Sequence, residues 1–89
     1  MTVRYFEKVT RGAGHHRRIR ALFLIEQQGA LPLDMLASTL KTDYRNASQH
    51  LSKLHNAGLI EKHNRGRLVL HSLTPLGTSF LTFYRSIER

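Results

Sequence analysis

Side chains that make directional hydrogen bonds fill the run from Tyr44 to Lys53, which includes Arg45, Asn46 and Gln49. An arginine can fork onto the two acceptors of a guanine edge, and an asparagine or glutamine can pair with adenine in the same bidentate way. We therefore expect Arg45, and either Asn46 or Gln49, to contact bases. Hydroxyl and ammonium groups suit phosphate oxygens, which fix register rather than sequence. The residues expected at phosphates are Tyr44, Ser48, Ser52 and Lys53.

A second basic group lies in the short turn Asn64-Arg65-Gly66-Arg67, between two runs of β-favouring residues. Asparagine and glycine are typical of tight hairpin turns. Two guanidinium groups at a hairpin tip can reach phosphates, or a narrow minor groove whose negative potential favours arginine. We therefore expect Arg65 and Arg67 to bind a nucleic-acid backbone, and a merely solvated turn is the alternative.

The helix that must position the first group follows from capping and hydrophobic spacing. Asp43 is the expected N-cap, and Gly58 is expected to end the helix. Between them Ala47, Leu51 and Leu54 form one narrow apolar stripe. The polar residues named above then fall on the outward side of that helix.

Two further helices are expected before it. The first begins at His15 and ends at Gly29, and its apolar residues fall on two faces, so more than one partner must cover it. Ala30–Asp34 opens the second, shorter helix, with Pro32 in its first turn. Since only a very short turn separates the last two of these three helices, the pattern predicts a helix-turn-helix.

Residues 1–14 are expected to form a lead-in to the domain. Val3, Phe6 and Val9 are spaced three apart, which weakly indicates a short helix that packs on the body. The stretch Gly12-Ala-Gly14 predicts a loop or hinge after it.

Residues 75–88 are expected to form the last helix of a domain that spans residues 15–89. Its apolar residues repeat at intervals of four, three and four, which is the spacing of a coiled-coil seam, although packing on the core is the alternative. Together with the two-faced first helix, it offers more apolar surface than so small a domain can cover. We therefore expect a homodimer. The expected interface residues are Leu24, Leu76, Phe80, Phe83, Tyr84 and Ile87.

Charge supports a polyanionic partner. The chain has 89 residues, enough for one domain, with a net charge of +8 and a pI near 10.9. Basic side chains that neutralise phosphates release condensed counterions, so such a surface favours binding to nucleic acid. The alternative is that the excess of positive charge serves only to keep the protein soluble. The absence of cysteine excludes disulfides, thiolate metal sites and cysteine nucleophiles.

Other function classes find little support. The N-terminal residues have no apolar core of a signal peptide, and the longest apolar run, Ala21–Ile25, is far short of the roughly 20 residues that span a bilayer. We therefore expect a cytoplasmic protein without membrane contact. Since no glycine-rich phosphate loop, metal spacing or nucleophile–base pair is recognisable, we expect neither an enzyme nor a bound cofactor.

Four pieces of the sequence resemble winged-helix regulators of the ArsR and MarR types, in the order found in those families. The recognition-helix piece is Ser48-Gln-His-Leu-Ser-Lys-Leu-His-Asn-Ala-Gly-Leu-Ile60, and the helix before it is Leu33-Asp-Met-Leu-Ala37. Arg65-Gly-Arg67 resembles the wing, and Leu73-Thr-Pro-Leu-Gly77 resembles the start of the closing helix. The resemblance covers roughly residues 15–85. It implies a mainly helical α+β fold, the winged helix-turn-helix, with a three-helix core, a two-stranded wing and a C-terminal helix.

The same resemblance implies a sequence-specific regulator of transcription, acting as a repressor. Its third helix would enter the major groove of double-stranded DNA, and its wing would contact the backbone or minor groove. A non-specific or architectural DNA-binding protein and an RNA-binding winged helix remain the alternatives. Metal-sensing ArsR proteins use cysteines, or aspartate and histidine on the last helix, and residues 75–89 contain none of these. No metal is therefore expected, and His50 is expected to be a packed, hydrogen-bonded histidine.

Overall fold

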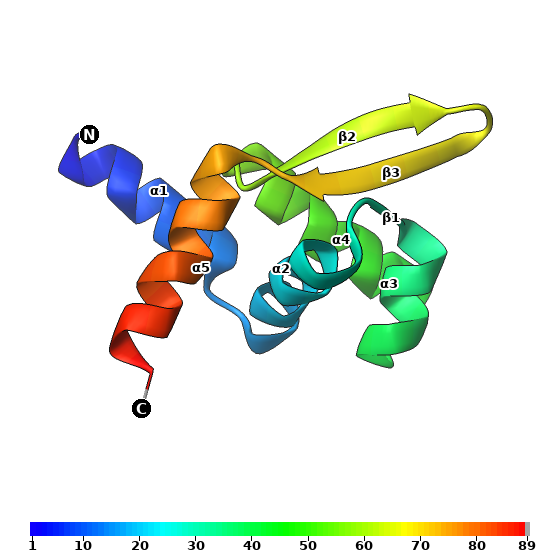
Figure 1. Cartoon of the computed structure of the whole chain (residues 1–89), viewed down its shortest axis with the longest axis horizontal. Coiled ribbons are helices and arrows are strands. Elements are labelled where there is room, and N and C mark those ends of the chain that lie inside the picture. Colours follow the sequence, from blue (N-terminus) through cyan, green and yellow to red (C-terminus); the bar gives the residue numbers. More distant parts are fainter. Residues whose placement is uncertain (89) are drawn as a thin grey trace.

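Five helices and three short strands follow one another along residues 1–88, the part of the chain that this computed structural model describes. The elements are α1 Val3–Ala13, α2 His16–Gln28, β1 Leu31–Pro32, α3 Leu33–Leu40, α4 Tyr44–Asn56, β2 Ile60–Arg65, β3 Leu68–Leu73 and α5 Pro75–Ile87. Figure 1 shows the β2–β3 hairpin projecting from the helices, with α1 and α5 at the opposite end of the molecule. The predicted winged helix-turn-helix class, mainly helical α+β, is confirmed. The predicted domain ends at residue 89, which lies outside the described residues.

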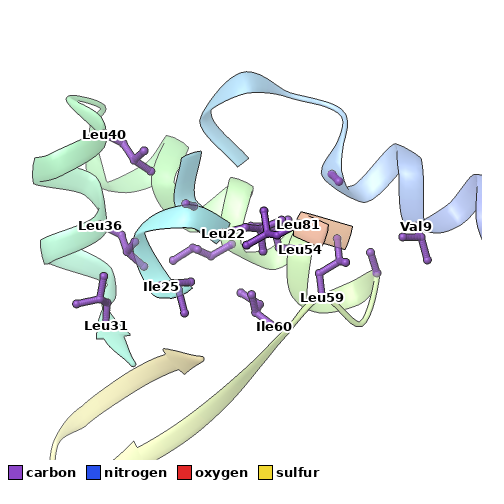
Figure 2. Packing of buried hydrophobic residues seen from close by; sticks show 14 residues of the cluster. Val9, Leu22, Ile25, Leu31, Leu36, Leu40, Leu54, Leu59, Ile60 and Leu81 are labelled. Atoms are coloured by element: carbon purple, nitrogen blue, oxygen red, sulfur yellow. The ribbon is translucent and has the colours of Figure 1, made fainter. Parts of the chain in front are cut away.

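The core forms where α2, α3 and α4 meet. Leu22, Leu36 and Leu54 from these helices are fully buried, and Leu81 of α5 joins them (Figure 2). Burying each such side chain contributes roughly 1.5–3 kcal/mol. Helix α2 contacts α3, α4, α5 and β3, which confirms that its apolar residues need cover on more than one side.

Capping residues set the ends of α2 and α5, and of these only Gly29 was predicted to end a helix. The side chain of His15 accepts a hydrogen bond from the Arg17 backbone N–H at 3.1 Å, so α2 begins directly after His15. It ends at Gly29, whose φ of +84° is available to glycine at little cost. Helix α5 begins after Thr74, whose hydroxyl accepts the Gly77 N–H at 3.0 Å.

The predicted place of Pro32 in a first helical turn is wrong. Leu31 and Pro32 instead form β1, paired antiparallel with His71 and Leu70 of β3, and α3 begins at Leu33. The sheet therefore has three strands in the order β1-β3-β2, rather than the two of the predicted wing. Leu31 is buried and its carbonyl accepts a hydrogen bond from Nδ1 of His71 at 3.0 Å, which fixes this segment to the sheet.

Helix α1 is longer than expected. The predicted helix is present and Val9 is buried against the body, together with Ala13. The prediction is wrong for the other two residues of the expected packing face, because Val3 and Phe6 are 86% and 49% exposed. The predicted loop is wrong for Gly12 and Ala13, which continue the helix. A Cβ on Gly12 would clash with the Cβ of Ala57, so the glycine permits close packing of α1 on the end of α4 rather than breaking the chain.

Within residues 1–88, no helix has both the length and the apolar content needed to cross a membrane.

Candidate nucleic-acid interface

Helix α4 is held in place at its start. At its start the Asp43 carboxylate accepts the backbone N–H of Asn46 at 2.7 Å, so the predicted N-cap is confirmed. The turn from α3 is compact because Lys41 takes a left-handed conformation, with a φ of 54°. Its N–H donates to the Ser38 carbonyl at 3.2 Å, and the N–H of Thr42 donates to the Ala37 carbonyl at 3.1 Å. Helices α3 and α4 thus form the predicted helix-turn-helix.

The outward face of α4 carries the side chains expected to contact DNA. Ala47, Leu51 and Leu54 point into the core, as predicted. The exposed residues on the other side are Tyr44, Arg45, Asn46, Ser48, Gln49 and Lys53, and Ser52 is half-buried. Part of this face borders a hollow of about 520 Å³, the α4 hollow, whose lining includes Asn46, Gln49, Lys53 and Asn56. These four residues recur three or four positions apart, so they lie along one side of the helix.

The structure separates the two amides that were expected to read adenine. The Nδ2 group of Asn46 donates to Oδ2 of Asp43 at 3.3 Å, which engages its amide in the cap. No hydrogen bond joins the side chain of Gln49 to another of the described residues. Gln49 therefore has both its donor and its acceptor free for a bidentate contact, and it is the better candidate of the two.

The wing is built from β2 and β3 in register from Ile60↔Leu73 to Arg65↔Leu68. The predicted four-residue tip is wrong at its first two positions, because β2 continues through Asn64 and Arg65. A two-residue turn, Gly66–Arg67, connects the strands. Gly66 has a φ of +63°, as the first residue of such a turn requires.

One side of the wing faces α4. Between the wing, α4 and the start of α3 lies a groove of about 440 Å³, the wing groove, whose lining includes Tyr44 and Ser48 from α4, Lys62 and Arg67 from the hairpin and Asp34 from α3. Arg65 is exposed but does not line this groove. Alternate residues of a strand point to opposite faces of the sheet, so Arg65 is on the face opposite Lys62. Of the two wing arginines, which were predicted as a pair, only Arg67 therefore lines the wing groove.

Three histidines gather where α2 meets α4. The centroid of the His15 ring lies 4.5 Å from that of His50, and His16 stacks on His15, also at 4.5 Å. Arg18 donates from Nε to Nδ1 of His50 at 3.1 Å, so His50 is packed and hydrogen-bonded, as predicted. Partial burial, together with the neighbouring histidines and arginines, lowers the pKa of both His15 and His50. Among residues 1–88, no group of three or more His, Cys, Asp or Glu residues is arranged to hold a metal ion.

Sequence reasoning missed part of the polar surface. Asn56 extends the outward side of α4, and Lys8 and Arg11 of α1 lie beside its end, bordering a third hollow of about 380 Å³. The spacing of Asn46, Gln49 and Lys53 could have identified Asn56 as a continuation of the same side. Nothing in the sequence places α1 against α4, because that contact joins residues far apart in the chain.

The residues expected at a dimer interface divide into two groups. Leu24, Leu76 and Phe80 are half-buried and pack on the core of their own chain. Tyr84 is also half-buried, with its ring edge-on to Phe23 at 5.1 Å between centroids. Phe83 and Ile87 are 51% and 63% exposed, and they remain available to a partner.

Comparison with known proteins gives structural matches but no sequence matches. No protein-family model matches the chain, and no curated protein sequence is similar enough to count as a relative. Among solved structures, it is similar to the homodimeric winged helix-turn-helix DNA-binding domain of Mb0332 from Mycobacterium bovis, a possible ArsR-family transcriptional regulator. The TM-score is 0.82 at 20% identity, covering 96% of this chain and 78% of that one.

Two further structures agree with this comparison. The transcriptional repressor PagR of Bacillus anthracis has a TM-score of 0.81 at 17% identity, covering 92% of this chain and 94% of PagR. The transcriptional regulator HlyU of Vibrio vulnificus has a TM-score of 0.75 at 20% identity, covering 92% of this chain and 85% of HlyU. The chain therefore has the winged helix-turn-helix fold of ArsR-type transcriptional regulators.

Proposed function

We propose that this chain is a sequence-specific regulator of transcription that binds double-stranded DNA. Helix α4 would enter the major groove, the only groove of B-DNA wide enough for a helix. Arg45 and Gln49 would contact base edges. Phosphates would be bound by Tyr44, Ser48, Ser52 and Lys53 on α4 and by Arg65 and Arg67 on the wing.

One observation carries this proposal: Tyr44 and Ser48 on the exposed polar face of α4 border a groove whose opposite wall supplies Lys62 and Arg67. The phosphate-binding candidates of α4 are thereby next to cations suited to holding the backbone, on the same helix as the base-reading candidates Arg45 and Gln49, in a chain of net charge +8. The similar structures are of transcriptional regulators rather than enzymes, which supports the same function.

We propose further that the protein works as a homodimer and represses transcription. The domain of Mb0332 is homodimeric and PagR is a repressor, and both are similar in fold to this chain. The exposed Phe83 and Ile87 give α5 an apolar surface that a second copy would cover. Since a twofold dimer reads two related half-sites, the target would be a palindrome with half-sites about one helical turn apart.

Selection from a library of randomised duplexes, at two salt concentrations, tests this function. Enrichment of a palindrome with the stated spacing is the expected result. Binding without enrichment, lost steeply as salt rises, would indicate a non-specific or architectural DNA-binding protein. Tighter binding to RNA than to duplex DNA in direct competition would indicate an RNA-binding protein. Either result would contradict the proposal.

Two matched variants separate the reading of bases from the holding of the backbone. Arg45→Ala should weaken specific binding by about 1–3 kcal/mol and relax the preference at one base pair. Arg67→Ala should weaken binding to all sequences alike and make the slope of log K against log salt shallower by about one. Both side chains are exposed, so neither change should alter the fold. Indistinguishable effects of the two variants would refute this division of roles.

A further inference from the structure

Helix α1 has a basic face that the proposed interface does not include. Arg4, Lys8 and Arg11 are spaced four and then three residues apart, so they lie on one side of the helix. All three are exposed. The buried Val9 and Ala13 occupy a different side and pack on the body, and the buried Gly12 lies between the two sides.

This basic face adjoins the outward face of α4. The hollow of about 380 Å³ between the two helices, the α1–α4 hollow, is bordered by Lys8, Arg11, Arg18 and Lys53. Arg18, Lys53 and Asn56 also border the α4 hollow, so the two hollows lie next to each other. None of the described residues that line either hollow is acidic.

Two sets of contacts hold α1 in this position. The absence of a side chain at Gly12 allows α1 to approach Ala57 at the end of α4. The Arg18 guanidinium bridges the three helices: it donates to the carbonyls of Arg11 and Gly12 at 3.3 and 3.1 Å, and to Nδ1 of His50 at 3.1 Å. The basic face of α1 is therefore fixed relative to the recognition helix rather than attached to a free arm.

The geometry points to a second backbone-binding site: we propose that Lys8 and Arg11 bind phosphates of the same DNA duplex, beyond the stretch that α4 contacts. A helix of 13 residues is about 20 Å long, so groups at the far end of α4 lie well away from its base-reading start. Recognition helices contact base edges with their N-terminal residues. Lys8 and Arg11 lie next to the C-terminal end of α4, so they are placed to bind the DNA backbone that flanks the bases contacted by that helix.

One local contact competes with this use of Arg11. Its guanidinium pairs with the carboxylate of Glu7 at 3.1 Å, with both side chains largely exposed. Exposed pairs of this kind contribute little to stability. A phosphate can therefore replace the carboxylate without loss of a structural contact. Lys8 has no such pair among the described residues.

The test measures binding to a duplex of fixed sequence over a series of salt concentrations. Lys8→Ala and Arg11→Ala should each make the slope of log K against log salt shallower by about one, and the double variant by about two. The matched control is Arg20→Ala, which removes one exposed charge of α2 that borders neither hollow, and it should leave the slope unchanged. Thermal melting of each variant should match that of the wild type, because the altered side chains are exposed.

This inference rests on the proposed DNA-binding function, and the outcomes distinguish the two. If the wild type binds no duplex DNA, both fail. If the wild type binds and Arg45→Ala weakens it, while Lys8→Ala and Arg11→Ala behave like Arg20→Ala, the site on α1 alone is refuted. A slope change seen with duplex RNA but not with duplex DNA would assign the face to RNA and also overturn the proposal.

Discussion

Replacing Gly77 by alanine should measurably destabilise the fold. Gly77 is in the first turn of α5, which packs against Gly58 and Leu59, two residues that lie between α4 and β2. Thr74 joins α5 to these residues: its N–H donates to the Leu59 carbonyl at 3.2 Å, and its hydroxyl donates to the Gly58 carbonyl at 2.6 Å. A Cβ on Gly77 would clash with the same Leu59 carbonyl oxygen, and it would lie 3.2 Å from Cδ2 of Leu73.

The size of the effect follows from which atoms must move. The Leu59 oxygen belongs to the backbone, so the clash is relieved only if the start of α5 shifts, which strains the bond from Thr74. Overpacking of this kind costs about 1–3 kcal/mol, and loss of one hydrogen bond costs about 0.5–1.5 kcal/mol. Alanine recovers about 1 kcal/mol of helix propensity relative to glycine. The net free energy of unfolding should therefore fall by about 2 kcal/mol.

Urea denaturation followed by circular dichroism measures this change. A loss of that size should lower the urea midpoint by about 1 M, and the melting temperature by about 8–16 °C. Ser79→Ala is the control, because Ser79 is exposed on the same helix and its loss should change stability by less than about 0.5 kcal/mol. All variants need the same protein concentration, since a dimer melts in a concentration-dependent way. Equal midpoints for Gly77→Ala and the wild type would show that the start of α5 yields freely, and would refute the reasoning.

Three further predictions concern the interface, the sheet and the recognition helix. Phe83→Asp should convert the proposed dimer to a monomer in sedimentation, because it places a charge on an apolar contact surface. Burial of His71 lowers its pKa below 6.5 despite its bond to the Leu31 carbonyl. Stability should therefore be greatest above pH 6.5 and fall as the pH drops toward the folded-state value. Asp43→Ala should remove the N-cap of α4 and cost about 1 kcal/mol in urea denaturation.

Each of these has a contrary outcome. An unchanged sedimentation coefficient for Phe83→Asp would mean that Phe83 lies outside the interface. For the sheet, an NMR titration that gave His71 a pKa at or above 6.5 would contradict the expected effect of burial. Unaltered stability of Asp43→Ala would show that solvent satisfies the first N–H groups of α4 as well as the carboxylate does.

Local signals were enough to predict the helices that carry the site. Asp43 caps α4, and the stripe of Ala47, Leu51 and Leu54 alone fixes which side of that helix faces outward. Gly29 marks the end of α2 through its positive φ. These features depend on residues within a few positions of one another, so sequence spacing describes them well.

The errors arose where distant segments decide the structure. Pro32 lies in a strand because it pairs with Leu70 of β3. Leu70 is far along the chain, so local spacing does not reveal this pairing. Gly12 continues α1 although glycine ordinarily weakens a helix, and its missing side chain leaves room for Ala57, which is far along the chain. Arg65 lies on the face of the wing that points away from the groove because of the register of the hairpin. A shift of one residue in that register would move its side chain to the other face.

The sheet is also protected against unwanted growth. One outer edge is β1, which has only two residues and ends in a proline that offers no N–H. The other edge, β2, carries Glu61, Lys62 and Arg65, and charged side chains discourage pairing with a foreign strand. β1 pairs only with Leu70 and His71, so the edge of β3 beyond it is open at Leu68 and Val69, which are 54% and 41% exposed, but this open stretch is only two residues long. The projecting wing therefore offers other chains one charged edge and one very short edge, which limits pairing with a foreign strand.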